Sequence, residues 1–120
     1  MEWKFSPDMP IYTQLVQKLQ SAIASGTISP GQRLPAVREL AMEASVNPNT
    51  VQRAYQELER TGLVYSQRAS GHFATEDPAV IFQGKMQLAK ERTAAYLQDM
   101  ALLGYEKAEL LDLIREMKEE

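Results

Sequence analysis

The polar side chains just after position 47 have chemistry that stands out in this sequence. Asn49, Gln52 and Arg53 carry amide and guanidinium groups within five residues of one another. Such groups make paired hydrogen bonds to flat polar edges: arginine fits the O6/N7 edge of guanine, and glutamine or asparagine fits the N6/N7 edge of adenine. The stretch VNPNTVQRAYQELERTG (46–62) therefore suggests recognition of a nucleic acid, provided that one element presents these groups together.

An amphipathic helix presents them together. The apolar positions of the stretch follow the i, i+3, i+4, i+7 spacing of a helix with one buried face: Val51, Ala54, Tyr55 and Leu58. We expect Asn47 to cap this helix with its side-chain oxygen and Pro48 to occupy the first helical position, where a missing N–H costs nothing. The polar residues then lie on the opposite face.

Two further helices precede this one. A helix over about 11–24 has an apolar stripe and a stop signal at Gly26, and a short helix after Pro35 repeats its apolar residues at helical spacing up to Ala44. About three residues separate the short helix from the one that begins at Asn47. Two helices joined by so tight a turn have the layout of a helix-turn-helix.

After Gly62 the pattern changes to a period of two. Residues 63–67 and 72–74 predict two short strands around the glycine-containing turn at 69–71, and we assign Tyr65 and Phe73 to the packing of this hairpin. The expected fold is mainly α with a small β-hairpin: a winged helix-turn-helix DNA-binding domain over 1–75, followed by a helical-hairpin dimerisation tail over 76–120.

The C-terminal segment predicts two helices, over about 79–102 and 106–118, with Gly104 between them. Two helices with a long apolar side cannot bury that side alone, so it must meet the winged domain or a second chain. We expect a two-fold dimer, which would place two recognition helices about 34 Å apart on DNA. The expected interface residues are Leu88, Tyr96, Leu103, Leu110 and Ile114.

The charge of the chain is unevenly distributed. The formal net charge is −3, but residues 1–75 hold seven Lys/Arg against six Asp/Glu, and residues 76–120 hold six against ten. The acidic balance therefore belongs to the C-terminal segment, where it would keep that segment off DNA. The charge alone gives the N-terminal part no positive support for DNA binding.

Several classes of protein do not fit the composition. The chain has no cysteine and one histidine, so we expect no metal site and no cofactor. It has no glycine-rich phosphate loop and no carboxylate pair placed in a cleft, which argues against an enzyme. No apolar run approaches the length of a membrane span, and no signal peptide is recognisable, so we expect a cytoplasmic protein without a membrane partner.

The sequence resembles the DNA-binding domain of GntR-family transcription regulators over residues 10–75. Four linked pieces carry the resemblance, in order: LPAVRELA (34–41), NTV (49–51), LERTGL (58–63) and RASGHF (68–73). The short C-terminal segment resembles the YtrA-type subgroup, whose tail serves chiefly in dimerisation. Two positions depart from the family pattern: Ser45 replaces the usual turn glycine, and Pro48 replaces an arginine that reads guanine in many members.

The resemblance and the helix pattern together give a set of expected DNA contacts. Gln52 and Arg53 are the expected base readers, whereas Asn49 and Thr50 lie nearer the DNA backbone. By resemblance, Arg38 is a further contact. The full set is Arg38, Asn47, Asn49, Thr50, Gln52, Arg53, Arg68, Ser70, Gly71 and His72. Two of these have competing structural roles: Arg38 as the ion-pair partner of Glu39 or Glu57, and His72 as a packing residue.

Two functions remain in competition at this stage. The first is a sequence-specific, dimeric DNA-binding regulator, a repressor of a promoter near its own operon that binds an inverted repeat. The second is a winged-helix protein–protein adaptor without DNA binding, which would not need its arginines to converge on one face. The sequence decides neither the operator nor the regulated genes, and it leaves open whether a small-molecule effector exists.

Overall fold

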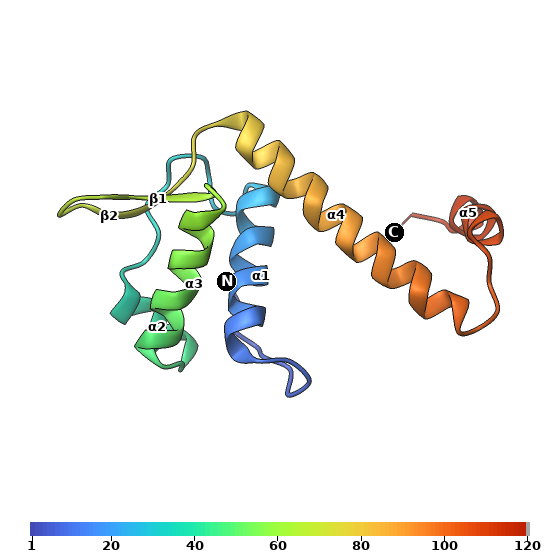
Figure 1. Cartoon of the computed structure of the whole chain (residues 1–120), viewed down its shortest axis with the longest axis horizontal. Coiled ribbons are helices and arrows are strands. Elements are labelled where there is room, and N and C mark those ends of the chain that lie inside the picture. The colour runs from blue at the N-terminus through green and yellow to red at the C-terminus, as the bar shows by residue number, and fades with distance from the viewer. Residues whose placement is uncertain (120) are drawn as a thin grey trace. The chain divides into compact units, whose positions relative to one another are not determined.

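The computed structural model of the protein describes residues 1–119, which form two compact units. We call residues 1–86 the head unit and the residues from 87 onward the tail unit. The elements in chain order are α1 (Ile11–Ser25), α2 (Val37–Ala44), α3 (Pro48–Arg60), β1 (Val64–Gln67), β2 (Gly71–Ala74), α4 (Pro78–Ala101) and α5 (Lys107–Glu116) (Figure 1). The expected mainly helical fold with one hairpin is confirmed.

The core of the head unit lies between α1, α2 and α3 and continues under the hairpin. Leu15 of α1, Leu40 of α2 and Leu58 of α3 are each 0% exposed. Burying a side chain of this size stabilises the fold by about 1.5–3 kcal/mol. The apolar stripes that predicted the three helices are therefore the surfaces that hold them together.

Tyr55 joins α3 to the chain that leads into α2. Its ring is fully buried, as predicted, and its hydroxyl donates a 2.7 Å hydrogen bond to the carbonyl of Pro35. Burial, with the nearby carboxylates of Glu39 and Glu43, raises the pKa of the Tyr55 hydroxyl, so it stays protonated and remains a donor. This bond ties the start of the helix-turn-helix to its second helix.

The hairpin is antiparallel, with its register running from Val64 opposite Ala74 to Gln67 opposite Gly71. The other edge of β2 is also paired, because residues 31–34 run along it. The N–H of Leu34 donates to the carbonyl of His72 at 2.8 Å, and the N–H of Ala74 donates to the carbonyl of Gln32 at 2.9 Å. The connection between α1 and α2 therefore runs beside β2 as a third extended segment of the wing.

The head unit extends beyond residue 75, where the sequence placed the domain boundary. Val80 and Ile81 in the first turn of α4 pack against the head core, and Gly84 lies close to Leu63. A Cβ on Gly84 would come within 3.1 Å of a Leu63 methyl group. The compact unit therefore ends at Met86 because the first two turns of α4 belong to its packing.

The tail unit buries little of its apolar surface. Leu110 is 2% exposed, whereas Leu103 and Ile114 are 70% and 53% exposed, and α4 has no fully buried residue. Leu110, expected at a dimer interface, therefore supports the tail unit of its own chain. None of the helices among residues 1–119 is long and apolar enough to span a membrane.

Candidate nucleic-acid interface

The start of α3 is built as its sequence predicted. The side-chain oxygen of Asn47 accepts a 2.8 Å hydrogen bond from the N–H of Asn49, and Pro48 occupies the first helical position. Asn49 is exposed and Thr50 is half-buried at this end. The N-terminal end of a helix carries free N–H groups and a partial positive charge, which suit a phosphate oxygen or a base acceptor.

One row of side chains on α3 faces the hairpin. Glu59 contacts two hairpin residues: its carboxylate lies 3.1 Å from His72 Nε2 and accepts a 3.4 Å hydrogen bond from the Ser66 hydroxyl. Gln52 lies seven positions before Glu59, and Gln56 lies between them, so the three form an i, i+4, i+7 row. Glu59 is the member of this row that contacts the hairpin. Gln52 and Gln56, nearer the start of α3, are exposed.

A second row on α3 faces α1. The guanidinium carbon of Arg53 lies 4.2 Å from the centre of the Tyr12 ring on α1, a cation–π arrangement. Farther along the same row, Glu57 accepts a 2.8 Å hydrogen bond from Arg60 Nε, and Arg60 holds the pKa of the Glu57 carboxyl below its usual value. The two residues expected to read bases are both exposed and have different neighbours: Gln52 lies on the row that continues to the hairpin contacts, and Arg53 lies over Tyr12.

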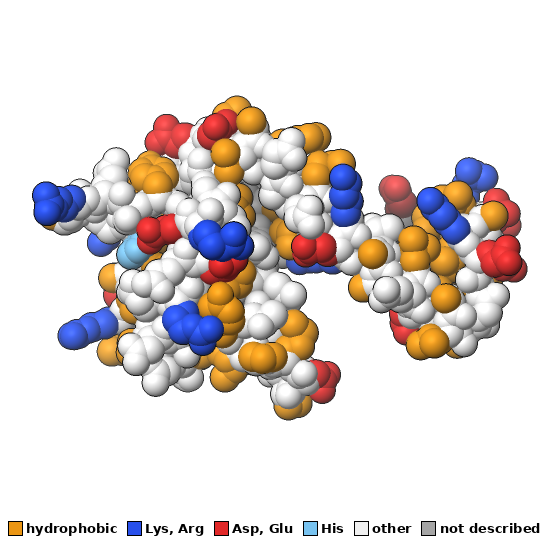
Figure 2. All heavy atoms as spheres, viewed as in Figure 1, with side chains coloured by type: hydrophobic (Ala, Val, Ile, Leu, Met, Phe, Trp, Pro, Cys, Tyr) orange, Lys and Arg blue, Asp and Glu red, His pale blue; other side chains and the backbone are white. Residues whose placement is uncertain are grey.

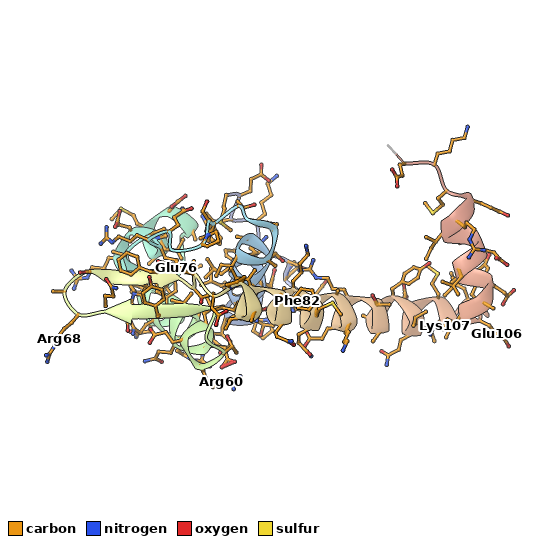
Figure 3. All side chains as sticks on the ribbon, turned by 90° about the horizontal axis from the view of Figure 1, so that it is seen from above. Arg60, Arg68, Glu76, Phe82, Glu106 and Lys107 are labelled. Carbon is orange, nitrogen blue, oxygen red and sulfur yellow. The ribbon has the colours of Figure 1, made fainter. Side chains whose placement is uncertain are left out.

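The tip of the hairpin consists of three exposed residues, Arg68, Ala69 and Ser70. Arg68 projects from the end of the wing (Figure 3). Behind the tip, Arg33 Nε donates a 3.1 Å hydrogen bond to the carbonyl of Ser70. Gly71 has a φ of +113° and leaves room for this guanidinium, because a Cβ there would lie 3.1 Å from Arg33 Nε.

Arg33 was absent from the residues that the sequence indicated. It lies in the connection between α1 and α2, where no periodicity marks a functional position. Its role depends on the pairing of residues 31–34 with β2, with Arg33 itself opposite Phe73. Only tertiary structure brings these segments together, so local sequence patterns carried no signal for it.

His72 has a structural environment. Besides its contact with Glu59, its ring centre lies 4.9 Å from that of Tyr55, and its side chain is 20% exposed. The sequence left open whether His72 contacts DNA or packs within the fold. The structure shows packing partners for it. Arg68 and Ser70 remain the exposed wing residues for contact with DNA.

Arg38 is exposed on α2, and both ion-pair partners that the sequence suggested for it are engaged elsewhere. Glu39 accepts a 3.2 Å hydrogen bond from the N–H of Ala36 at the start of α2, and Glu57 pairs with Arg60. Among residues 1–119, no carboxylate forms an ion pair with Arg38. Its guanidinium group is therefore available to a phosphate or a base edge.

The space-filling view shows Lys and Arg side chains standing apart from one another on the head unit, interspersed with acidic side chains (Figure 2). The face in this view has separate cationic side chains and no continuous basic patch. No group of three or more His, Asp or Glu residues within the described part of the chain is arranged to hold a metal ion. The arrangement suits hydrogen-bonded contact with a few phosphates and base edges.

Comparison with known proteins agrees with this geometry. The family model "Bacterial regulatory proteins, gntR family" matches residues 11–73. The HTH-type transcriptional repressor YtrA of Bacillus subtilis is 38% identical over 109 residues, which cover 90% of this chain and 84% of that protein. A GntR family transcriptional regulator from Listeria monocytogenes has a similar structure, with a TM-score of 0.86 and 38% identity over 95% of this chain and all of that one.

A relative of the head unit has been solved on DNA. The DNA-binding domain of AraR in complex with its operator ORE1 matches 62% of this chain and 94% of that one, with 28% identity and a TM-score of 0.54. The family model, the full-length relative and the structural matches converge on one assignment, and the adaptor interpretation is not favoured. The chain belongs to the GntR family and is a DNA-binding transcriptional regulator.

Proposed function

We propose that this regulator is a homodimeric repressor that binds an inverted-repeat operator in a promoter near its own operon. The observation that carries the proposal is the exposed polar row of α3 beside a wing whose tip presents Arg68. YtrA, named as a repressor, supports the sign of regulation, and AraR bound to its operator supports double-stranded DNA as the partner. Action on chromosomal DNA would place the protein in the cytoplasm.

In this proposal the polar residues at the start of α3 have different tasks. Gln52 reads a base edge in the major groove, and Asn49 and Thr50 contact the DNA backbone near the helix start. Arg38 and Arg68 hold phosphates on either side of the groove, which fixes the position of the head unit without reading sequence. Arg53 contacts DNA only while its guanidinium group stays over the Tyr12 ring.

The exposed apolar side chains of the tail unit support the dimer. Leu102, Leu103, Leu111 and Met117 are each more than half exposed, and Figure 2 shows hydrophobic side chains at the surface of this unit. Soluble monomers rarely leave an apolar surface of this kind uncovered. A two-fold partner would cover it and supply the second recognition helix that an inverted repeat requires.

Selection of bound duplexes from a random DNA pool at about 150 mM salt tests the proposal, because this salt suppresses non-specific phosphate binding. We expect an enriched inverted repeat with half-sites about one DNA turn apart. The double charge reversal Arg38→Glu with Arg68→Glu should abolish enrichment, whereas Lys107→Glu in the tail unit should preserve it. Enrichment of a single unrepeated site would contradict the dimer, and no enrichment would contradict sequence-specific binding.

A further inference from the structure

The head unit contains a cavity of about 280 Å³ on the side of α2 that faces the N-terminal segment. Its apolar wall comes from Trp3, Leu19, Ile28, Leu34 and Leu40. Pockets for drug-sized ligands usually measure about 300–1,000 Å³, so this cavity suits a smaller molecule. All of its lining residues belong to the head unit.

The wall beside the N-terminus is an irregular segment whose backbone is hydrogen-bonded to one buried side chain of α1. The side chain of Gln14 is buried, and it donates to the carbonyls of Ser6 and Met9 and accepts from the N–H of Ser6, each at 2.7 Å. Residues 1–6, which lie before this anchor, form no helix or strand. Trp3 therefore lines the cavity from a segment without helix or strand, where it packs against the head core and stacks on Phe5 with 6.5 Å between the ring centres.

Trp3 also has an unmet requirement. Its indole N–H is buried, and it is the only buried side-chain donor or acceptor found without a hydrogen-bond partner within residues 1–119. A buried N–H without an acceptor costs about 1–3 kcal/mol. A ligand oxygen that reached this group through a small movement of the segment would remove that cost.

The polar lining adds a charge preference. Thr27, Gln32, Arg33 and Glu43 supply the polar part of the lining, so the cavity has one cationic and one anionic side chain beside it. Arg33 uses its Nε–H on the wing, and its remaining guanidinium N–H groups are donors with a positive charge. An oxygen-bearing anion beside Arg33 accepts hydrogen bonds from these donors. A cationic ligand would instead pair with the carboxylate of Glu43.

The same Arg33 connects the cavity to the wing. Its neighbours Gln32 and Leu34 are bonded to β2 through Ala74 and His72, and its own Nε holds the carbonyl of Ser70 at the wing tip. A ligand that draws the Arg33 guanidinium toward the cavity therefore competes with the contact that positions the tip. Occupancy of the cavity and the position of the wing become linked.

We propose that this cavity binds a small carboxylate with an apolar body, and that its occupancy changes DNA affinity through Arg33 and the wing. The apolar body lies against Trp3, Leu19 and Leu40, and the carboxylate lies between Arg33 and the indole N–H. The regulatory half of this inference rests on the operator binding proposed above. The ligand-binding half does not.

The chain has a single tryptophan, so one indole N–H signal in the ¹⁵N-correlated NMR spectrum of the whole protein reports on the cavity. We would titrate the protein with 3-phenylpropanoate, and separately with its neutral amide and with 3-phenylpropylamine. The expected result is a saturable shift of the Trp3 indole signal with the carboxylate, at least about tenfold tighter than with the amide or the amine. No saturable shift with the carboxylate, or equal binding of carboxylate and amide, would overturn the site, and tighter binding of the amine would assign selection to Glu43.

Two variants separate ligand binding from folding. Arg33→Gln should weaken binding of the carboxylate by about tenfold and leave binding of the amide unchanged. The matched control Arg68→Gln removes an arginine outside the cavity and should leave both affinities unchanged. If Arg33→Gln weakened both probes equally, its role would be structural and the carboxylate assignment would be wrong.

The regulatory half is tested with a fluorescent duplex carrying the selected operator. Saturating 3-phenylpropanoate should change the operator Kd of the natural protein several-fold and leave that of Arg33→Gln unchanged. An NMR-detected complex with an unaltered operator Kd would overturn the regulatory half alone. If selection yielded no operator, the proposed DNA function would fail, while the indole titration would still decide whether the cavity binds the carboxylate.

Discussion

The head unit and the tail unit cover their apolar side chains to very different degrees. The head unit encloses a continuous core drawn from α1, α2, α3 and the hairpin, whereas among residues 87–119 one residue, Leu110, is fully buried. The head unit can therefore hold its fold by its own packing. The tail unit has apolar side chains that its own chain leaves exposed, and we infer that a second chain covers them.

The largest expected effect comes from charging the tail surface. Leu103→Asp combined with Ile114→Asp places carboxylates on exposed apolar positions, which a monomer tolerates and an apolar interface does not. We expect the variant to sediment as a monomer. Because a single head unit would then bind one half-site, affinity for the full operator should fall about 10²- to 10⁴-fold.

The control for that variant adds the same charge at exposed polar positions of α4, Thr93→Asp with Gln98→Asp. It should remain dimeric and bind the operator nearly as tightly as the natural protein. A Leu103/Ile114 variant that stayed dimeric would remove these residues from the interface. A dimer formed through the head units would then become the better interpretation.

The next effect in size tests the other side of the comparison. Leu58→Ala opens a cavity in the head core at a residue with no exposure, and we expect it to reduce the free energy of unfolding by about 2–5 kcal/mol. Truncation of Met42 to alanine, at a position of the head unit that is 83% exposed, should change it by no more than about 0.5 kcal/mol. Urea unfolding at one fixed protein concentration measures both variants, and similar losses at the two positions would mean that Met42 is as well packed as Leu58.

The same contrast explains what the sequence could predict. Helical spacing located α1, α2 and α3, and the apolar residues that set this spacing are the buried ones, because periodicity records which face meets the core. Asn47 and Pro48 marked the start of α3 through local chemistry. Period-two alternation and Gly71 located the hairpin in the same way. Features that are determined within one helix or hairpin could therefore be predicted from the sequence.

Features that depend on contacts between elements could not be predicted from the sequence. The pairing of residues 31–34 with β2 brings Arg33 to the wing, and nothing local to Arg33 marks that contact. The placement of Arg53 over Tyr12 depends on how α1 crosses α3, so the pattern of α3 alone could not predict that contact. The boundary after Met86 likewise depends on the packing of Val80 and Ile81 against the core.

A third, smaller effect should distinguish the two rows of α3. Gln52→Ala should cost about 1–3 kcal/mol of operator binding and relax specificity at one base position, because the amide of Gln52 lies on the row beside the wing. Arg53→Ala should leave the base preference in place and weaken binding less, since its guanidinium stacks on Tyr12. Repeating the duplex selection with each variant measures both effects, and a changed base preference in Arg53→Ala alone would reverse the assignment.

The smallest effect concerns backbone strain, which is present at Ser45 in the head unit. Ser45, at the end of α2, has φ +56° and ψ +47°, whereas the left-handed position in the tail unit is filled by Gly104. The left-handed conformation costs a residue with a Cβ about 1–2 kcal/mol, and glycine loses more backbone entropy on folding, about 0.5–1 kcal/mol. Ser45→Gly should therefore stabilise the head unit by up to about 1 kcal/mol in urea unfolding and leave dimer dissociation unchanged. Ser45→Ala keeps the Cβ, so it should bring no such gain; a gain equal to that of glycine would show that the serine hydroxyl, and not the backbone, is the source of the cost.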